Sequence, residues 1–263
     1  MSTVRHFLSI GAGNCDAEIR LATELRKSGA SDFVIDCLDL NERMLERGKA
    51  AAAASDLAVH IEPICADFNS WQPSLKYKAV LVNHALHHVL RMEALLDEIR
   101  DSLQPGGSLI LSEMIGLNGH RRWPEALGPL IRFWDELPES YRYNHRLQRQ
   151  DTEYPDWDCA TGGFEGIRCQ DIVPLLLERF HFRFFYAFGN VVAPFVDRCY
   201  GPNFDARSEW DRVFIDRVHA FDEVEIMAGR IKPTIMLAVL GVEEPEKLVC
   251  LKPRTPEFCV RWP

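Results

Sequence analysis

Three histidines lie close together in the chain, His84, His87 and His88. Imidazole titrates near neutral pH, so histidine is the first choice when a general base must deprotonate a hydroxyl. If a helix has begun at this point, positions 84 and 87 share one face. The spacing His-x-x-His-His is also compatible with a divalent metal ion. A structural alternative is that His88 is a hydrogen-bonded core residue and that His87 caps a helix.

Residues 7–16, FLSIGAGNCD, predict a cradle for a cofactor. An apolar run stops at Gly11 and Gly13, and a helical pattern follows from Asp16, which we expect to be the N-cap. Glycines permit a tight turn and let a ligand lie against the main chain, and the helix N-terminus offers free N–H groups. The nicotinamide fingerprint needs a third glycine where this chain has Asp16, so that cofactor is disfavoured. The structural alternative is a turn that binds nothing.

Acidic residues follow the next two predicted strands. Asp39 lies at the carboxyl end of the strand over 33–38, where ligands bind in open α/β sheets, and its carboxylate can accept both hydroxyls of a ribose. Asp67 and Phe68 follow the strand over 58–65, where an acid and an aromatic ring can bind an adenine. The alternatives are a solvated loop aspartate at 39, and a turn acid beside a core phenylalanine at 67 and 68.

Strands and helices must alternate to bring these residues to one edge of a sheet. The hydrophobic pattern alternates in this way and predicts an α/β fold, with a parallel sheet covered on both faces. After a first strand that ends at Gly11, the predicted strands are 33–38, 58–65, 79–82, 108–112, 182–188 and 235–242, and the predicted helices are 16–27, 41–54, 91–103 and 164–181.

Five motifs occur in order over about residues 5–115: FLSIGAGNCD, DCLDLNERML, CADF, VLVNHALHHV and SLQPGGSLILSE. Together they resemble the successive motifs of the class I methyltransferases that depend on S-adenosylmethionine (SAM). The resemblance implies a seven-stranded, mostly parallel, Rossmann-like sheet flanked by helices, with the last strand antiparallel. It also implies SAM as the cofactor and S-adenosylhomocysteine (SAH) as the product.

The resemblance further implies roles for single residues. Asn83 would lie near the sulfonium, so the histidines that follow it would lie at the methyl end of SAM; we expect the general base to be His84, then His87, then His145. Some quinone-pathway methyltransferases carry Glu-x-x-Glu-His at this place, but two of these acids are histidines here, so we expect no metal. Ser9 departs from the family, which often has an acid there. The other implied cofactor contacts are Gly11, Ala12 and Gly13 at the methionine part, Asp39 at the ribose, Leu40 beside the adenine, and Asp67 and Phe68 at the adenine edge.

A long segment after the fifth strand, 116–166, does not read as one regular element and is rich in aromatic and cationic residues. We expect a lid that binds a polar or anionic ring-bearing substrate, such as a sugar or a phosphorylated metabolite. The alternative is a lid stabilised by its own aromatics, with solvated arginines. The expected domains are a SAM-binding core over 1–115, the lid over 116–166, completion of the sheet with a second cap segment over 167–243, and a tail over 244–263.

The composition limits the classes of molecule that we expect the protein to bind and the compartment in which we expect it. With 263 residues and 47% hydrophobic residues the chain can bury a large core, and its net charge of −9 disfavours nucleic-acid binding. No apolar run is long enough to span a bilayer, and no room for a signal peptide precedes the first strand. The 8 cysteines form no CxxC pair, which is typical of reduced thiols in the cytoplasm. Aromatic residues of the lid could cover a substrate or a neighbouring subunit, so a homo-oligomer is also compatible.

These patterns favour an enzyme that moves a methyl group from SAM to a small polar acceptor. A hydroxyl of a sugar or secondary metabolite is the first expectation. An amine acceptor is the second, and a SAM-binding inactive or regulatory module is an alternative of another class. A nicotinamide oxidoreductase ranks last, because the third glycine is absent.

Overall fold

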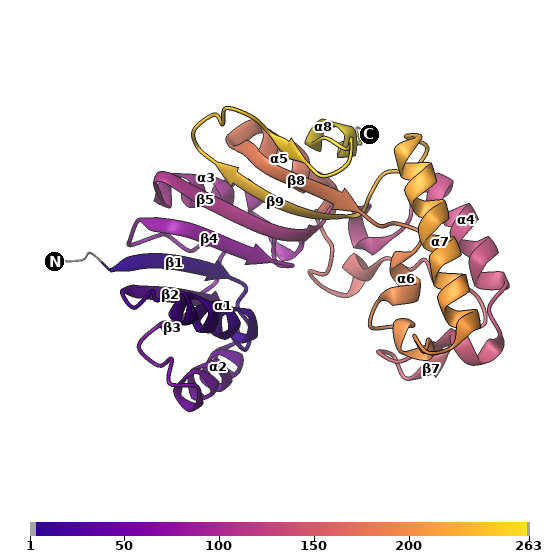
Figure 1. Cartoon of the computed structure of the whole chain (residues 1–263), viewed down its shortest axis with the longest axis horizontal. Helices are drawn as coiled ribbons and strands as arrows, with labels where there is room; N and C mark the ends of the chain where they lie inside the picture. The colour runs from indigo at the N-terminus through magenta and orange to yellow at the C-terminus, as the bar shows by residue number, and fades with distance from the viewer. Residues whose placement is uncertain (1–3, 262–263) are drawn as a thin grey trace.

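The computed structural model describes residues 4–261. Its centre is an eight-stranded sheet in the order β10-β8-β9-β5-β4-β1-β2-β3 (Figure 1). Neighbouring strands from β3 to β5 run parallel, whereas β9 runs antiparallel to both β5 and β8. The strands are β1 Arg5–Ile10, β2 Phe33–Asp39, β3 Ile61–Cys65, β4 Tyr77–Asn83, β5 Leu103–Met114, β8 His181–Phe188, β9 Ile235–Gly241 and β10 Val249–Cys250.

The expected α/β class is confirmed, including the antiparallel last long strand, but the strand count is larger by one. The extra strand is β10, which comes from the C-terminal tail and pairs in parallel with Phe184 and Phe185 of β8. Without it β8 would be an edge strand with unpaired backbone groups. A two-residue strand carries too little periodicity to be found in the sequence.

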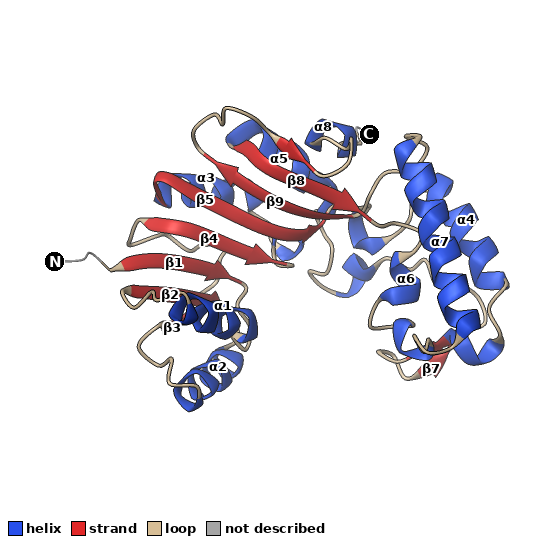
Figure 2. Ribbon diagram, in the orientation of Figure 1, coloured by secondary structure: helices blue, strands red, loops and turns tan. Residues whose placement is uncertain are grey.

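Helices cover both faces of the sheet (Figure 2). The alternation along β1 shows why: Leu8 and Ile10 belong to the core under α3 and α5, whereas Phe7 packs into the core under α1 and α2. Successive side chains of a strand point to opposite faces, so a sheet buried on both faces is apolar throughout. The covering helices are α1 Asp16–Lys27, α2 Glu42–Ala54, α3 Met92–Ser102, α5 Ile172–Arg179 and α8 Pro256–Cys259.

A helical cap with its own core stands beside the carboxyl ends of the parallel strands (Figure 1). Its main helices are α4 (Pro124–Asp135) and α7 (Glu209–Met227). Residues 116–166, which do not read as one regular element in the sequence, contain several short elements and the helix α4, which buries Ala126, Leu130 and Trp134 at spacings of four. Pro129 inside this helix obscured the pattern. The smaller cap elements are η2 Asn118–His120, η3 Glu139–Arg142, β6 Tyr143–Asn144, β7 Arg149–Gln150, η4 Cys159–Gly162, α6 Ala193–Val196 and η6 Gly201–Asn203.

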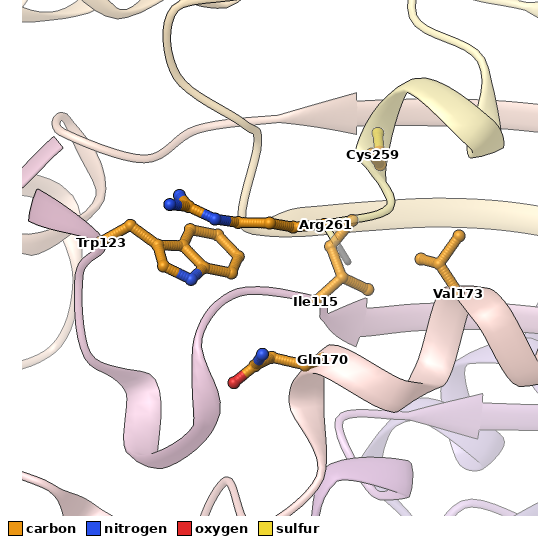
Figure 3. A pocket seen from close by; sticks show the side chains of 6 residues that line it. All are labelled: Ile115, Trp123, Gln170, Val173, Cys259 and Arg261. Atoms are coloured by element: carbon orange, nitrogen blue, oxygen red, sulfur yellow. The ribbon is translucent and has the colours of Figure 1, made fainter. Parts of the chain in front are cut away.

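The C-terminal segment ties the cap to the sheet. The guanidinium of Arg261 lies 4.8 Å from the centre of the Trp123 ring and forms an ion pair with Glu125 at the start of α4. Figure 3 shows this junction, where Arg261 reaches over Trp123 while Cys259 of α8 lies on the side of the sheet. The crevice between these side chains leaves no space for a ligand. The junction therefore acts as a clamp rather than as a binding pocket.

Two helix boundaries differ from the sequence-based expectation. The helix predicted over 164–181 is shorter: 3-10 turn η5 (Cys169–Asp171) leads into α5, and Gly166 before it has a φ of +70°. This left-handed conformation suits glycine and is incompatible with a helix at this residue. The expected N-cap Asp16 is instead the first residue of α1, and the cap is Cys15, which also has a positive φ of 59°.

Candidate active site

The turn after β1 is bent by Gly11. Its φ is +74°, and the backbone N–H groups of Gly11 and Ala12 donate to the carbonyl oxygen of Leu38 at 2.8 and 3.1 Å. A Cβ added at Gly11 would lie 2.6 Å from the Cβ of Ala85. Only glycine permits this approach, which brings the turn after β1 against the turn after β4.

Asp39 is the last residue of β2 and faces the same turn. Its Oδ2 accepts from the backbone N–H of Gly13 at 2.8 Å, and its Oδ1 accepts from the N–H of Asn41 at 2.8 Å. The neighbouring Leu40 is 64% exposed. Two backbone donors thus orient the carboxylate at the carboxyl edge of the sheet, where each oxygen retains a lone pair for a ligand hydroxyl.

Asp67 and Phe68 follow β3, and Asn83 ends β4. The Oδ1 of Asp67 accepts from the N–H of Asn69 at 2.8 Å, which closes a local turn. Phe68 is half-buried and packs on the core beside α3. Asn83 is exposed at the same edge as Asp39. All three lie in loops or strand ends at the carboxyl edge of the parallel sheet.

Position 9 of β1 is a serine, and an acid from another element, Glu18 of α1, lies beside it. The Ser9 hydroxyl donates to Oε1 of Glu18 from α1 at 2.6 Å, and the exposed fractions of the two residues are only 2% and 4%. Oε2 of Glu18 has no hydrogen-bond partner among the described residues. Burial raises the pKa of Glu18, and the hydrogen bond from Ser9 only partly offsets this effect. A buried carboxyl group thus lies behind the glycine turn, although β1 itself has a serine at position 9.

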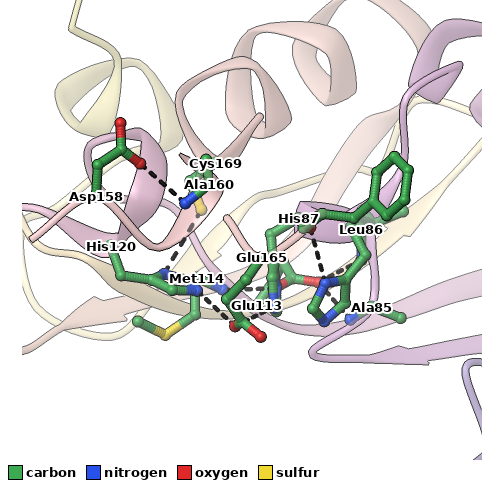
Figure 4. A network of polar contacts seen from close by, with 12 residues as sticks. Ala85, Leu86, His87, Glu113, Met114, His120, Asp158, Ala160, Glu165 and Cys169 are labelled. Atoms are coloured by element: carbon green, nitrogen blue, oxygen red, sulfur yellow. Dashed lines mark hydrogen bonds and ion pairs between the residues drawn. The ribbon is translucent and has the colours of Figure 1, made fainter. Parts of the chain in front are cut away.

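Glu113 organises the histidine turn that follows β4 (Figure 4). It is fully buried, and its Oε2 accepts from the N–H groups of Ala85 and Leu86 at 2.9 and 2.7 Å. Its Oε1 lies 2.5 Å from Nδ1 of His87 and accepts from the N–H of Met114 at 2.7 Å. Burial would lower the pKa of His87, but hydrogen bonds to Glu113 and to Glu165 outweigh it and raise this pKa to about 9.

The other histidines of this turn differ from the buried His87. His84 is exposed and has a left-handed φ of 52°, and its Nε2 lies 3.4 Å from the Ser112 hydroxyl oxygen. Desolvation by the surrounding protein lowers the pKa of His84. His88 is half-buried, with Nδ1 3.0 Å from the carbonyl oxygen of Phe164, and desolvation lowers its pKa too. Of the three histidines, only His84 is exposed to solvent.

The structure brings His84 and His87 together, with ring centres 6.4 Å apart, but it places His145 elsewhere. His145 lies in the cap, between β6 and β7, and its Nε2 is 2.8 Å from Oδ1 of Asn203. This bond couples two cap segments, 143–145 and 201–203.

Sequence reasoning missed three acids: Glu18, Glu113 and Glu165. Glu113 carried a signal, since it lies near the end of β5, shortly after the apolar run 109–111, and a buried carboxylate requires partners. Glu165 carried none, because the pattern predicts a helix over 164–181 where the structure has a loop before η5. Its Oε1 lies 2.8 Å from Nε2 of His120 and 3.5 Å from Nε2 of His87. His120 lies in the segment 116–166, and no motif singles it out from the other cationic residues there.

Part of the chain resembles a known protein family in sequence. Residues 7–107 match the model of a family described as a methyltransferase domain, whereas no curated protein sequence matches the chain. Within residues 4–261 no helix has both the length and the apolar character needed to cross a membrane.

Two solved structures share the fold over 93% of this chain. One is the O-methyltransferase from a trans-AT polyketide synthase multienzyme of Brevibacillus brevis in complex with SAH, with a TM-score of 0.52, 14% identity and 68% of that chain covered. The other is the O-methyltransferase segment of StiE, residues 961–1257, with a TM-score of 0.51, 12% identity and 70% covered. Residues 7–107 thus match a methyltransferase domain, as expected for an enzyme that depends on SAM, and the two solved structures share the Rossmann-like fold of the whole chain.

Proposed function

We propose that the protein transfers the methyl group of SAM to a hydroxyl of a small polar acceptor, with His84 as general base. The contact between Gly11 and Ala85 carries this proposal, because it sets the histidine turn against the glycine turn. A cofactor whose methionine part lies along residues 11–13 and whose ribose binds Asp39 then has its methyl end beside Asn83 and His84. His84 is the histidine of this turn whose side chain is exposed and can meet an acceptor.

The cap is the proposed acceptor-binding part, and residues 1–115 are the proposed SAM-binding core. The positive charge of Arg198, from the loop after α6, is close enough to His84 to contribute to lowering its pKa. This supports a cap that faces the methyl end of the cofactor. A polar acceptor, such as a sugar or a phosphorylated ring compound, suits a site with an arginine on one side and an imidazole on the other.

The reaction balances with the groups named. The acceptor oxygen attacks the methyl carbon in line, the C–S bond breaks, and SAH leaves as a neutral thioether. The hydroxyl proton passes to Nε2 or Nδ1 of His84. Alignment of two bound reactants supplies much of the rate, and a positioned base adds about 10²–10⁴-fold.

The cofactor site is tested by calorimetric titration with SAH. We expect micromolar binding by the wild type and a loss of at least about tenfold in Asp39→Ala, which corresponds to one charge-assisted hydrogen bond. Asp32→Ala is the matched control, because Asp32 precedes the amino end of the same strand and is exposed. Equal affinity in all three proteins would refute the role of Asp39.

The base is tested separately by screening sugars and phenols for SAH formation. His84→Ala should keep its affinity for SAH and lose about 10²–10⁴-fold in turnover, whereas His181→Ala, an exposed histidine at the start of β8, should behave like the wild type. Full turnover by His84→Ala on a hydroxyl acceptor would refute this role. Turnover on amines alone would point to N-methylation, which needs no base when the amine is neutral.

We also infer a reducing compartment, the cytoplasm, as the site of action. All eight cysteines lie within the described residues and are free thiols, and Cys15, Cys37, Cys169 and Cys259 are buried. Free thiols in such number are typical of proteins kept reduced. A chain purified without reductant from an oxidising compartment with its thiols intact would argue against this inference.

A further inference from the structure

Three side chains of types that can ligate a metal ion come from three separate segments and converge beside the histidine turn (Figure 4). They are His87 in η1 (Leu86–His88), His120 at the end of η2, and Glu165 in the loop before η5. Their ligand atoms, Nε2 of both histidines and Oε1 of Glu165, all lie within 4.8 Å of one another. The cap and the core each contribute to this cluster.

The distances fit a metal ion. An ion bound at about 2.0–2.2 Å to each donor separates its ligand atoms by about 2.9–3.5 Å, depending on whether the geometry is octahedral or tetrahedral. Oε1 of Glu165 lies 2.8 Å from Nε2 of His120 and 3.5 Å from Nε2 of His87. The remaining separation, between the two imidazole nitrogens, needs at most a small ring movement.

The partners of the imidazoles direct Nε2 toward the cluster. Nδ1 of His87 is held by the buried carboxylate of Glu113 at 2.5 Å, and Nδ1 of His120 lies 3.8 Å from Sγ of Cys169. Metal-bound histidines commonly engage a carboxylate through the other ring nitrogen, which fixes the tautomer and the orientation of the ring. His87 has this arrangement, and Glu113 is itself anchored by backbone N–H groups.

Backbone contacts hold the three segments together without help from the cluster itself. Gly119 donates to the carbonyl oxygen of Gly166 at 2.8 Å, and Ile167 donates to that of His87 at 3.1 Å. A Cβ atom added at Gly119 would lie 1.9 Å from Oδ1 of Asp158, and one added at Gly166 would lie 3.2 Å from the backbone nitrogen of Gly119. Both glycines have a φ of +70°. Residues 119–120 and 165–167 are thus packed tightly beside His87.

We propose that His87, His120 and Glu165 bind one divalent transition-metal ion of the zinc class. Two imidazoles and one carboxylate suit such ions, whereas Mg²⁺ and Ca²⁺ favour sites made of oxygen ligands. Three protein ligands leave a coordination position open. If the proposed methyl transfer to a hydroxyl is correct, the acceptor oxygen would take that position, where the ion lowers the pKa of the hydroxyl.

Metal binding itself provides the test, independent of turnover. The full chain, stripped with a chelator and kept reduced, is titrated with Zn²⁺ by calorimetry and with Co²⁺ by absorption spectroscopy. We expect one ion per chain, and a loss of at least about 100-fold in affinity in both His120→Ala and Glu165→Gln, since even outer-shell changes cost 10–100-fold. His145→Ala in the cap is the matched control and should bind like the wild type.

Titration of each variant with SAH reports whether its cofactor site is intact, and Glu165→Gln, which nearly keeps the shape of the side chain, stays informative if His120→Ala unfolds. No binding by folded wild type, unchanged affinity in Glu165→Gln, or a cobalt spectrum dominated by thiolate bands would overturn the proposal; thiolate bands would indicate binding by cysteines instead. Loss of the metal together with normal SAH binding and turnover would confirm the site but remove its catalytic role. Failure of the folded wild type to bind SAH would instead count against the cofactor assignments.

Discussion

Glu113→Gln is the substitution that probes the histidine turn most directly. The carboxylate is fully buried and accepts two hydrogen bonds at each oxygen. The amide of glutamine has nearly the same shape, but it replaces one acceptor oxygen by an NH₂ donor. If the NH₂ group replaces Oε2, the N–H groups of Ala85 and Leu86 face a third donor in a site without solvent. If it replaces Oε1, the N–H of Met114 does, together with Nδ1 of His87 while that nitrogen carries a proton.

The expected loss of stability follows from these contacts. A hydrogen bond to a charged group contributes roughly 1.5–3 kcal/mol, and removing one partner of a buried pair costs about 3–5 kcal/mol. Two lost bonds therefore predict a decrease in the free energy of unfolding of about 3–5 kcal/mol. For a chain of this size each kcal/mol lowers the melting temperature by roughly 2–4 °C, so Tm should fall by about 6–20 °C.

Thermal unfolding with a chelator present tests this value without any contribution from bound metal. Glu46→Gln is the matched control, because Glu46 is exposed on α2, and surface substitutions of this kind change stability by about 0.5 kcal/mol or less. A Tm for Glu113→Gln within about 2 °C of the wild type would refute the reasoning. The four hydrogen bonds of Glu113 would then contribute no more to the free energy of unfolding than an exposed side chain does.

Two further predictions concern the glycine turn. Gly11→Ala should weaken SAH binding at least tenfold and destabilise the fold by about 1–2 kcal/mol or more, because a Cβ at a φ of +74° is strained and would lie 2.6 Å from that of Ala85; urea unfolding and calorimetry measure both effects. Gly162→Ala, where a Cβ meets no atom within 4 Å, should stay within about 0.5 kcal/mol, and equal effects of the two changes would contradict the steric argument. Glu18→Gln should gain stability relative to the wild type as the pH rises from 4.5 to 8. Burial raises the folded-state pKa of Glu18, so its ionisation increasingly disfavours the folded wild type above the unfolded pKa; a difference that stays constant with pH in urea unfolding would show that the carboxylate beside Ser9 does not resist ionisation.

Much of the core could be predicted from the sequence because its signals are local. The apolar run before Gly11 predicts a buried strand, and the acid at the end of β2 predicts a ligand at the carboxyl edge. The alternation of strands and helices predicts the doubly covered sheet. Each of these signals depends on periodicity or on turn chemistry over a few residues, which is the range that sequence patterns report.

The remaining features depend on contacts between residues far apart in the chain, and only the tertiary structure decided them. Glu113 reaches the turn at Ala85, and Glu165 meets His120 and His87, because folded backbones carry these segments to one place. No periodicity encodes such meetings. The environment also gives different properties to residues of the same type. His87 lies buried between two carboxylates, whereas His84, three positions earlier, is exposed to solvent. The sequence alone therefore determined the expected class of protein and the edge of the sheet where we expect the cofactor to bind. Which histidine can take a proton, and which could hold a metal, depends on the burial and the neighbouring charges that folding creates.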